Sequence, residues 1–343
     1  MRTGTWATLA AGAAGAVIVR RAVAARALAR RGAADRVALV TGASRGLGFA
    51  IAADLAARGF RLAICAREPA ELAVAQAELA ARGAEVLALR CDVADRAQVD
   101  DLVRAVIERF GRLDVVVNNA GIIEVGPLAA MTVEDFADTH AVMFWGMLYP
   151  TIAALPHLRE RGRARIINIT SIGGRISAPH LLPYNCAKFA AVGFSEGLRA
   201  ELSGSGVTVT TVVPGLMRTG SHLRAQFKGR ANSEYAWFAL AASLPLLSMG
   251  AERAARRIVD AGLAGRAELV LTPAAKLGTR VHGLFPATTV RVLGWVNRLL
   301  PAAPGPAGPA VAGSVAAARL DSGLLEAATT MGRSAAQRLH QHT

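Results

Sequence analysis

The 343-residue sequence is poor in cysteine and in aromatic residues. None of its three cysteines, Cys65, Cys91 and Cys186, forms the C-x-x-C spacing of metal or redox sites. This pattern argues against a disulfide framework or a metal site, and predicts reduced packing cysteines in a cytoplasmic setting. Aromatic residues make up 5% of the chain, and no basic patch with interleaved aromatics occurs. We therefore expect no nucleic-acid partner.

Acidic residues are missing from the first 34 positions, which carry six arginines. Residues 273–343 contain seven Lys or Arg and two acids, so the two ends hold 11 of the 14 excess positive charges. The middle of the chain is nearly balanced. The net charge is thus a property of the ends and does not indicate a basic core.

Long apolar runs are also scarce, and the N-terminal one is borderline. Residues 3–19 form an uncharged run of seventeen positions, which is the lower limit for a membrane-spanning helix. Arginines follow the run, and the positive-inside rule then leaves the rest of the chain on the cytoplasmic side of the membrane. The segment 1–34 is predicted to be a membrane anchor, with a soluble or interfacial helix of a cytoplasmic protein as the alternative.

What the chain does have is an alternation of Val-rich strands and Ala-rich helices. This alternation predicts an α/β fold with a doubly wound parallel sheet of the Rossmann type. Prolines 150 and 156 are expected to kink or break one of the helices. Strands are expected at 36–41, 61–65, 85–90, 114–117, 165–169, 207–213 and 268–271, and helices at 46–58, 69–82, 95–109, 133–160, 183–203 and 251–264.

A glycine-rich turn, T-G-A-S-R-G-L-G, joins the first expected strand to the first expected helix. Glycines at these places let the backbone turn sharply, approach a pyrophosphate and pack the helix on the sheet. The N-terminus of that helix would face the phosphates. The predicted cofactor-binding residues of the turn are Thr41, Gly42, Ser44, Arg45, Gly46, Leu47 and Gly48.

Tyr184 and Lys188 lie four positions apart, and Ser171 stands thirteen residues before the tyrosine. Tyr and Lys at this spacing share one face of a helix, so the ammonium could lower the pKa of the phenol. Ser171 would end a strand, where its hydroxyl could hold a carbonyl oxygen beside the phenol. The three residues are therefore predicted to be catalytic, with Tyr184 exchanging the proton.

Together with N-N-A-G at positions 118–121, these motifs make residues 35–272 resemble the short-chain dehydrogenase/reductase family. The resemblance implies one catalytic domain, a homo-oligomer and hydride transfer between a nicotinamide cofactor and an alcohol or carbonyl. It also implies that Lys188 hydrogen-bonds the nicotinamide ribose while Ser171 orients the substrate. By the same resemblance, further cofactor contacts are expected from Asp92, Val93, Asn119, Ala120, Gly121, Tyr184, Lys188, Pro214, Gly215 and Thr219. Asn118 is expected either to support the cofactor and active site or only to tie neighbouring strands together.

The cofactor is predicted to be NADP(H), with NAD(H) as the alternative. The second strand ends in Ala66 and Arg67 where an acid would hold the ribose 2′-hydroxyl of NAD. Arg45 in the glycine turn supplies a second guanidinium for a 2′-phosphate. Each of the two would contribute about 1.5 to 3 kcal/mol through charge-assisted hydrogen bonds.

One residue departs from the family pattern. Family members carry an Asn on the helix after N-N-A-G, where it helps to hold a proton-relay water, and Met143 stands there instead. A thioether is a poor hydrogen-bond partner. The backbone carbonyl of residue 143 or the side chain of His140 could take over this task. A catalytically silent NADP(H)-binding sensor or scaffold is therefore the alternative function.

The remaining segments are expected to shape the substrate site. By the resemblance, residues 216–249 form a lid, and their apolar side chains predict a lipophilic carbonyl or alcohol as substrate, with ordinary packing or a subunit contact as the alternative. Residues 273–300 give two amphipathic stretches that either lie on a membrane surface or cover the lid. A Pro/Gly/Ala-rich linker and an Ala-rich tail complete residues 301–343.

Overall fold

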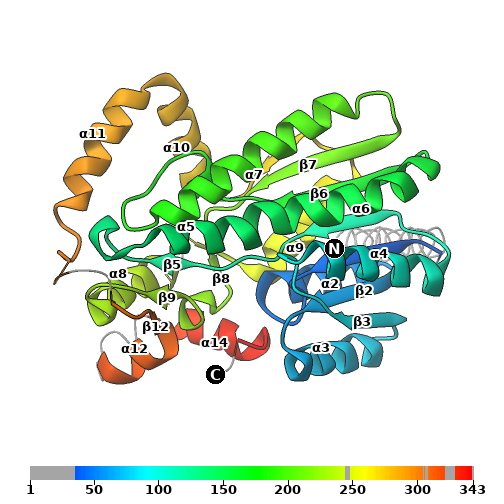
Figure 1. Cartoon of the computed structure of the whole chain (residues 1–343), viewed down its shortest axis with the longest axis horizontal. Coiled ribbons are helices and arrows are strands. Elements are labelled where there is room, and N and C mark those ends of the chain that lie inside the picture. The colour runs from blue at the N-terminus through cyan, green and yellow to red at the C-terminus, as the bar shows by residue number, and fades with distance from the viewer. Residues whose placement is uncertain (1–34, 244–247, 304, 306–307, 321–328, 342–343) are drawn as a thin grey trace, which may run out of the picture.

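The computed structural model describes residues 35–243, 248–303, 305, 308–320 and 329–341. Its centre is a sheet of seven parallel strands in the order β11-β7-β6-β4-β1-β2-β3 (Figure 1). The fold is therefore the predicted Rossmann-type α/β fold. The predicted N-terminal anchor at 1–34 lies outside the described residues. The strands are β1 (Val37–Thr41), β2 (Arg61–Ala66), β3 (Val86–Arg90), β4 (Val115–Asn118), β6 (Ala164–Ile169), β7 (Val207–Val213) and β11 (Glu268–Val270).

The strand order reverses at β1, and this reversal fixes where a ligand can bind. Strand β1 pairs with β2 on one side and with β4 on the other. The connections from these strands then leave toward opposite faces of the sheet and open a crevice at the carboxyl ends. The glycine turn follows β1 and N-N-A-G follows β4, so the topology brings both motifs to this crevice.

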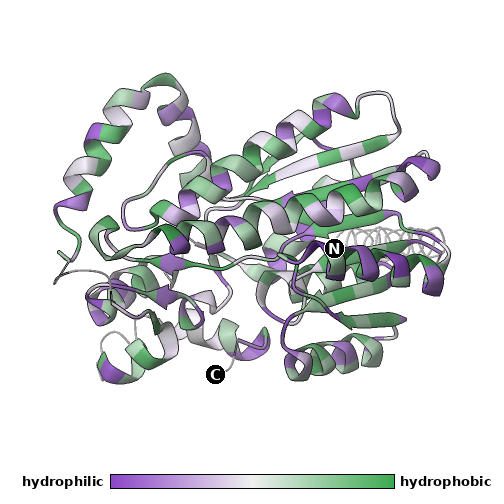
Figure 2. Cartoon of the chain, in the orientation of Figure 1, coloured by the Kyte–Doolittle hydropathy of each residue, from purple (hydrophilic) through white to green (hydrophobic). Residues whose placement is uncertain are grey.

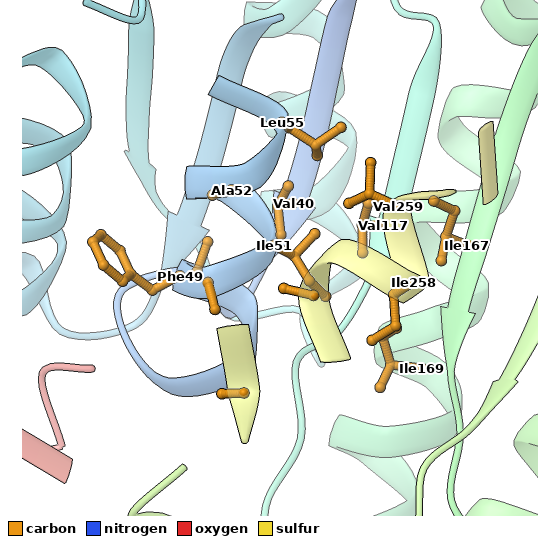
Figure 3. Close-up of a cluster of buried hydrophobic side chains, with 14 of the residues drawn as sticks. Val40, Phe49, Ile51, Ala52, Leu55, Val117, Ile167, Ile169, Ile258 and Val259 are labelled. Carbon is orange, nitrogen blue, oxygen red and sulfur yellow. The ribbon is translucent and has the colours of Figure 1, made fainter. Parts of the chain in front are cut away.

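Helices cover both faces of the sheet. On one face, α2 (Gly46–Ala57), α3 (Pro69–Ala81) and α9 (Ala251–Leu263) pack on it, and on the other α4 (Arg96–Phe110), α6 (Gly146–Glu160) and α7 (Leu182–Glu201) do so. The strands of the central sheet are coloured mainly as hydrophobic in Figure 2, and apolar residues of the helices pack on both of its faces. Figure 3 shows the first interface, where Ile51 and Leu55 of α2 lie on the side of α9, with its Ile258 and Val259, and of Val117 in the sheet.

Strands buried on both faces read as continuous apolar runs, because every side chain meets a helix layer. All five residues of β1 are buried. For this reason the inner strands are visible in the sequence, and all seven core strands were placed to within a residue at each end, although β3 and β11 are only partly buried.

The expected long helix at 133–160 is built from three pieces. It starts as α5 (Val133–His140), passes through a π-helical turn, η2 (Ala141–Trp145), and continues as α6. Pro150 and Pro156 lie inside α6, which continues through both of them, so the helix does not break at the prolines, and the kink expected as the alternative stays a prediction. This stretch also has the length and apolarity of a membrane span. Its buried Ala154 and Leu158, however, pack on the sheet as those of a core helix do.

A smaller unit sits beyond the carboxyl ends of the strands. It holds a second sheet of β5 (Glu124–Val125), β9 (Gln226–Phe227) and β12 (Val311–Ala312), and a third of β8 (Leu216–Arg218) and β10 (Ser248–Gly250). The helices α8 (Ala231–Ser243), α12 (Gly313–Leu320) and α14 (Thr330–Arg338) join it, whereas α10 (Pro273–Leu284) and α11 (Pro286–Asn297) project from the body (Figure 1). The described residues also include four short helical turns, η1 (Leu128–Ala130), η2, η3 (Ile172–Gly174) and η4 (Ser221–Leu223).

Candidate active site

A single large cavity collects the residues predicted from the sequence. Its volume is about 1490 Å³, and it lies at the carboxyl ends of the strands and beneath the smaller unit. Pockets for one drug-sized ligand measure roughly 300–1,000 Å³, so there is room for a dinucleotide and a substrate. Thr41 is buried beneath the glycine turn. The other predicted site residues line the cavity: Gly42, Ser44, Arg45, Gly46, Leu47, Gly48, Arg67, Asp92, Val93, Asn119, Ala120, Gly121, Ser171, Tyr184, Lys188, Pro214, Gly215 and Thr219.

The glycine turn needs its glycines for two different reasons. Gly42 and Gly46 adopt positive φ angles of 62° and 60°, which favour glycine. A Cβ at Gly48 would collide with the carbonyl oxygen of Gly42 and with the side-chain amide of Asn119. The turn therefore lies close against the N-N-A-G segment.

Asn119 and Thr41 fix this close approach. The Asn119 side-chain amide donates to the carbonyl oxygens of Thr41 and Gly42, at 3.0 and 3.1 Å. In return, the Thr41 hydroxyl accepts the backbone N–H groups of Asn119 and Ala120, at 3.0 and 3.1 Å. These hydrogen bonds hold the two motifs against each other, and Asn119 positions the glycine turn through its side-chain amide.

The C-terminal segment also reaches the glycine turn, and the sequence did not predict this. The Gly46 N–H donates to the carbonyl oxygen of Leu339, with an N···O distance of 2.7 Å. The His340 ring lies 4.3 Å from the Phe49 ring between centroids, and its Nε2 is 2.7 Å from an Oε of Glu78. Gln341 follows and lines the cavity. No local signal could have shown this contact, because almost three hundred residues separate the partners.

Two of the cationic side chains beside the turn share one acid. Arg45 forms an ion pair with Glu71 of α3, and Arg224 of the smaller unit pairs with the same carboxylate at 2.8 Å. Arg67 is exposed at the rim of the cavity. The sequence missed Glu71 and Arg224, which the fold brings to Arg45 from positions outside the motifs.

Ser171 and Tyr184 meet across the cavity, and Lys188 lies one helical turn beyond the tyrosine. Ser171 directly precedes η3, and its Oγ accepts the N–H of Gly173 at 3.0 Å. Burial raises the pKa of the Tyr184 phenol, and a hydrogen bond with Ser171 partly offsets this rise. The three side chains are thus assembled in one place.

Lys188 differs from the sequence expectation. Its Nζ donates to the Ile169 carbonyl at 2.8 Å and lies 5.9 Å from the centroid of the Tyr184 ring. Burial lowers the pKa of Lys188 to about 7. Burial raises the pKa of Tyr184, whereas the sequence suggested that the charge of Lys188 would lower it.

A row of buried polar side chains crosses the sheet under the site. The Asn118 amide donates to Thr151 of α6 at 2.9 Å and to the Asn168 side-chain oxygen at 2.8 Å. Asn168 then donates to Ser195 of α7 at 3.0 Å, and Ser195 contacts the Thr211 hydroxyl at 2.7 Å. Asn118 therefore ties β4 to its neighbours, which is one of the two roles considered for it.

Met143 lies in the π-helical turn η2 and faces the cavity. It is buried, and its Cε would lie 3.0 Å from a Cβ at Gly121. Such π turns concentrate at functional sites. His140 has its Nδ1 3.0 Å from the Phe136 carbonyl, and it is not among the residues that line the cavity in the described part of the chain.

The predicted lid places only part of its apolar surface over the cavity. Phe227 and Tyr235 pack with α12 in a core of their own, so ordinary packing accounts for them. Trp237 and Phe238 of α8 line the cavity.

A buried ion cluster fastens this lid to α5. Lys228 Nζ lies 2.6 Å from Asp135 and 3.7 Å from Glu124. Burial raises the pKa of Glu124, and the Asp135 charge adds to the rise. Burial opposes the charged form of Asp135 as well, but its hydrogen bond with Lys228 leaves the pKa lowered. Neither motif analysis nor composition predicted this cluster.

The geometry agrees with comparisons to known proteins. The family model described as short chain dehydrogenase matches residues 36–227. The chain belongs to the short-chain dehydrogenase family. It is accordingly an oxidoreductase of this family, and the resemblance read from the motifs is confirmed.

Several relatives resemble this family member along most of their own length. A 3-oxoacyl-acyl-carrier-protein reductase of Synechocystis sp. is 38% identical over 185 residues, which is 54% of this chain and 75% of the relative. A Mycobacterium tuberculosis protein named SadH is 35% identical over 272 residues, covering 76% of this chain and 98% of its own.

Two solved structures show the same fold. A short chain dehydrogenase/reductase from Burkholderia phymatum in complex with NAD has a TM-score of 0.67 at 27% identity, covering 73% of this chain and 93% of its own. A variant of the actinorhodin polyketide ketoreductase with NADPH has a TM-score of 0.62 at 31% identity, covering 70% and 97%.

Proposed function

We propose that the protein transfers a hydride between NADP(H) and a lipophilic carbonyl or alcohol. One observation carries the proposal: the Ser171 and Tyr184 hydroxyls and the Lys188 ammonium line the same cavity as the glycine turn. The likeness to a ketoreductase with NADPH supports the nicotinamide cofactor.

The residues present fit a dinucleotide. Gly42, Gly46 and Gly48 present backbone without side chains to the cavity, and the α2 N-terminus, whose Gly46 N–H is bonded to the Leu339 carbonyl oxygen, carries the partial positive charge that favours phosphate. The buried side-chain oxygen of Gln341 has no hydrogen-bond partner in the described structure, which suits a donor on a bound ligand. The bound nicotinamide would supply or accept the hydride.

The chain's own residues then handle the proton. In the reducing direction, Tyr184 gives its hydroxyl proton to the substrate oxygen while Ser171 holds that oxygen by a hydrogen bond. Because burial raises the pKa of Tyr184, the phenol carries its proton at neutral pH, as a proton donor requires. Lys188 hydrogen-bonds the ribose, and the anionic cofactor favours its charged form.

Arg45 and Arg67 support the preference for NADP(H). A 2′-phosphate would compete with Glu71 for the Arg45 guanidinium. It could also bind the Arg67 guanidinium, which is exposed at the rim of the cavity. Phosphate binds arginine through strong bidentate hydrogen bonds. NAD(H) remains the alternative, as in the Burkholderia relative.

The lipophilic substrate is inferred from the apolar part of the cavity wall. Trp237 and Phe238 of α8 and Leu293, Val296 and Leu300 of the projecting hairpin line the cavity there. The Synechocystis relative is named for a 3-oxoacyl substrate, which makes acyl carbonyls the first class to examine.

A substrate panel tests the proposal. Purified full-length protein is incubated with NADPH and 3-oxoacyl, steroid, retinoid and quinone carbonyls, and cofactor oxidation is followed by absorbance. We expect activity that rises with the apolar surface of the carbonyl compound. Activity confined to short hydrophilic carbonyls would contradict the lipophilic assignment.

Met143 favours a second candidate function, a silent NADP(H)-binding sensor or scaffold. A buried thioether stands where the family has an amide for its relay water. Tight NADPH binding without turnover of any compound in the panel would favour this candidate over the enzyme.

We further propose the setting in which the protein acts. All three cysteines are free, which supports a cytoplasmic location, and residues 1–34 are proposed to anchor the protein to the cytoplasmic side of a membrane. The proposed catalytic domain spans 35–272 with its lid at 216–249, followed by the extension 273–300 and the tail 301–343. The exposed Trp145, Ile152 and Phe189 support a homo-oligomer.

A further inference from the structure

The projecting hairpin of α10 and α11 exposes an unusual amount of apolar surface. Nine of the seventeen exposed large hydrophobic side chains in the described residues lie between positions 277 and 299. Helix α11 has no buried residue, and α10 has one, Ala275. Monomeric proteins rarely expose a contiguous apolar patch of this kind, and such patches mark binding surfaces.

The exposed side chains form stripes on both helices. On α10, Leu277, Val281 and Leu284 recur at the i, i+4, i+7 spacing of one helical face, with Leu284 74% exposed. On α11 and just beyond it, Trp295 and Leu299 are 63% and 86% exposed. In Figure 1 the two helices lead away from the body as an arch, and the exposed fractions of their side chains show that the rest of the described chain leaves both stripes uncovered.

The charges of the hairpin all have one sign. Residues 273–300 include Lys276, Arg280, Arg291 and Arg298 and no acidic residue, and all four cations are exposed. On α10, Lys276 and Arg280 both lie along one side of the apolar stripe, and on α11 Arg291 lies one turn before Trp295 on the same face. Apolar stripes bordered by cations are typical of helices that lie in the interface of a bilayer with anionic lipids.

The hairpin also adjoins the catalytic cavity. Leu293, Val296 and Leu300 line that cavity, while their neighbours Trp295 and Leu299 are exposed. One end of the hairpin surface is therefore continuous with the apolar wall of the substrate site.

We propose that the α10–α11 hairpin is a docking surface for an anionic lipid bilayer. A second copy of the chain is a poorer occupant, because two such hairpins would bring eight cations together without a neutralising acid. A bilayer accepts the apolar stripes and neutralises the cations. The proposal that the hairpin docks on a bilayer does not depend on the proposed function. The idea that a lipophilic substrate passes from the bilayer to the cavity does rest on the proposed function.

The test needs a signal from the hairpin itself, because the apolar run at residues 3–19 could also hold the full chain on vesicles. Trp295 provides the signal as the difference in fluorescence between wild type and Trp295→Phe. Full-length proteins are mixed with vesicles of phosphatidylcholine alone, or of phosphatidylcholine with phosphatidylserine, each with or without acyl-chain bromine as a contact quencher.

We expect the Trp295 difference emission to shift to the blue on anionic vesicles and to be quenched by bromine, with both effects weakened by salt. In the double variant Leu284→Asp with Leu299→Asp, the affinity for anionic vesicles measured from the Trp295 fluorescence change should fall by about tenfold or more. Val74→Asp, at an exposed apolar site on α3, is the matched control and should leave it unchanged.

An unquenched Trp295 on vesicles that carry the protein would overturn the proposal. So would a Trp295 signal that changes with protein concentration and not with lipid, since this would identify a second copy as the occupant. Because the readout is fluorescence, its failure is distinguishable from a failure of the proposed catalytic function.

Discussion

At the scale of single residues, Lys188 combines a catalytic position with a buried amine. Its pKa falls from 10.5 to about 7 because burial disfavours the ammonium. The folded protein therefore releases this proton near pH 7, whereas the unfolded chain holds it until about pH 10.4. Between these values the unfolded state binds more protons, so this group makes stability rise with pH.

We predict that without cofactor the free energy of unfolding of wild type rises relative to Lys188→Met between pH 7 and pH 10, by a few kcal/mol at most. Below pH 7 both states hold the proton and the difference should be constant. Urea unfolding at several pH values measures it. Parallel stability curves for the two proteins would show that Lys188 is charged throughout in the fold.

Arg67 and Arg45 give the second residue-scale prediction. We expect wild type to prefer NADPH over NADH by about tenfold or more in kcat/KM, which corresponds to roughly 1.4 kcal/mol. Arg67→Asp should move the preference toward NADH, and Arg96→Asp, a similar charge change on the exposed face of α4, should not. Equal efficiency with both cofactors in wild type would contradict the assignment of a 2′-phosphate site.

The sequence indicated which single residues gather at the site, but not how their charges are balanced. The motifs carry Gly42, Ser171, Tyr184 and their neighbours because chemistry and backbone geometry demand those residue types at fixed spacings. Glu71 and Arg45 are distant in the sequence and form an ion pair only in the folded chain, so a single sequence does not predict the pair. The raised pKa of Tyr184 was missed for the same reason, because burial is a property of the fold.

At the scale of elements, the ion cluster of Lys228 connects the lid to α5. Its side chains are 10–12% exposed, so removing the cation leaves Asp135 and Glu124 unpaired in a poorly hydrated place. We predict that Lys228→Met lowers the free energy of unfolding by about 3–5 kcal/mol.

Urea unfolding compares this variant with Lys276→Met, which changes an exposed lysine of α10 and should matter by less than about 0.5 kcal/mol. The double variant Lys228→Met with Asp135→Asn should recover part of the loss, because it removes one of the unpaired charges. A similar small effect for both single variants would show that the cluster is hydrated.

The elements of the sheet were predictable and those of the smaller unit were not. The inner strands of the sheet are buried on both sides, so their apolar composition reveals them. The strands β5, β9 and β12 are two residues long and join distant parts of the chain, which no local pattern can signal. The π turn at Met143 likewise shows no signature in a continuous helical pattern.

At the scale of the whole molecule, a second exposed apolar face lies on η2, α6 and α7, with Trp145, Ile152 and Phe189. If this face joins two copies, light scattering with size-exclusion chromatography should give a multiple of the 35.6 kDa chain mass. Trp145→Asp with Phe189→Asp should shift the protein toward monomer, and Val74→Asp should not. A wild-type monomer at micromolar concentration would contradict the proposed homo-oligomer.

The central claim concerns the proton that accompanies the hydride. It is tested most directly by a single-turnover experiment, in which NADPH-loaded wild type and Tyr184→Phe are mixed with one active carbonyl and NADPH absorbance is followed. Tyr184→Phe removes one hydroxyl and leaves the ring, so NADPH affinity should stay within a few fold. We predict that hydride transfer in this variant falls by at least about 10²-fold, the lower range of what a positioned acid contributes. Hydride transfer at the wild-type rate in Tyr184→Phe would contradict the account.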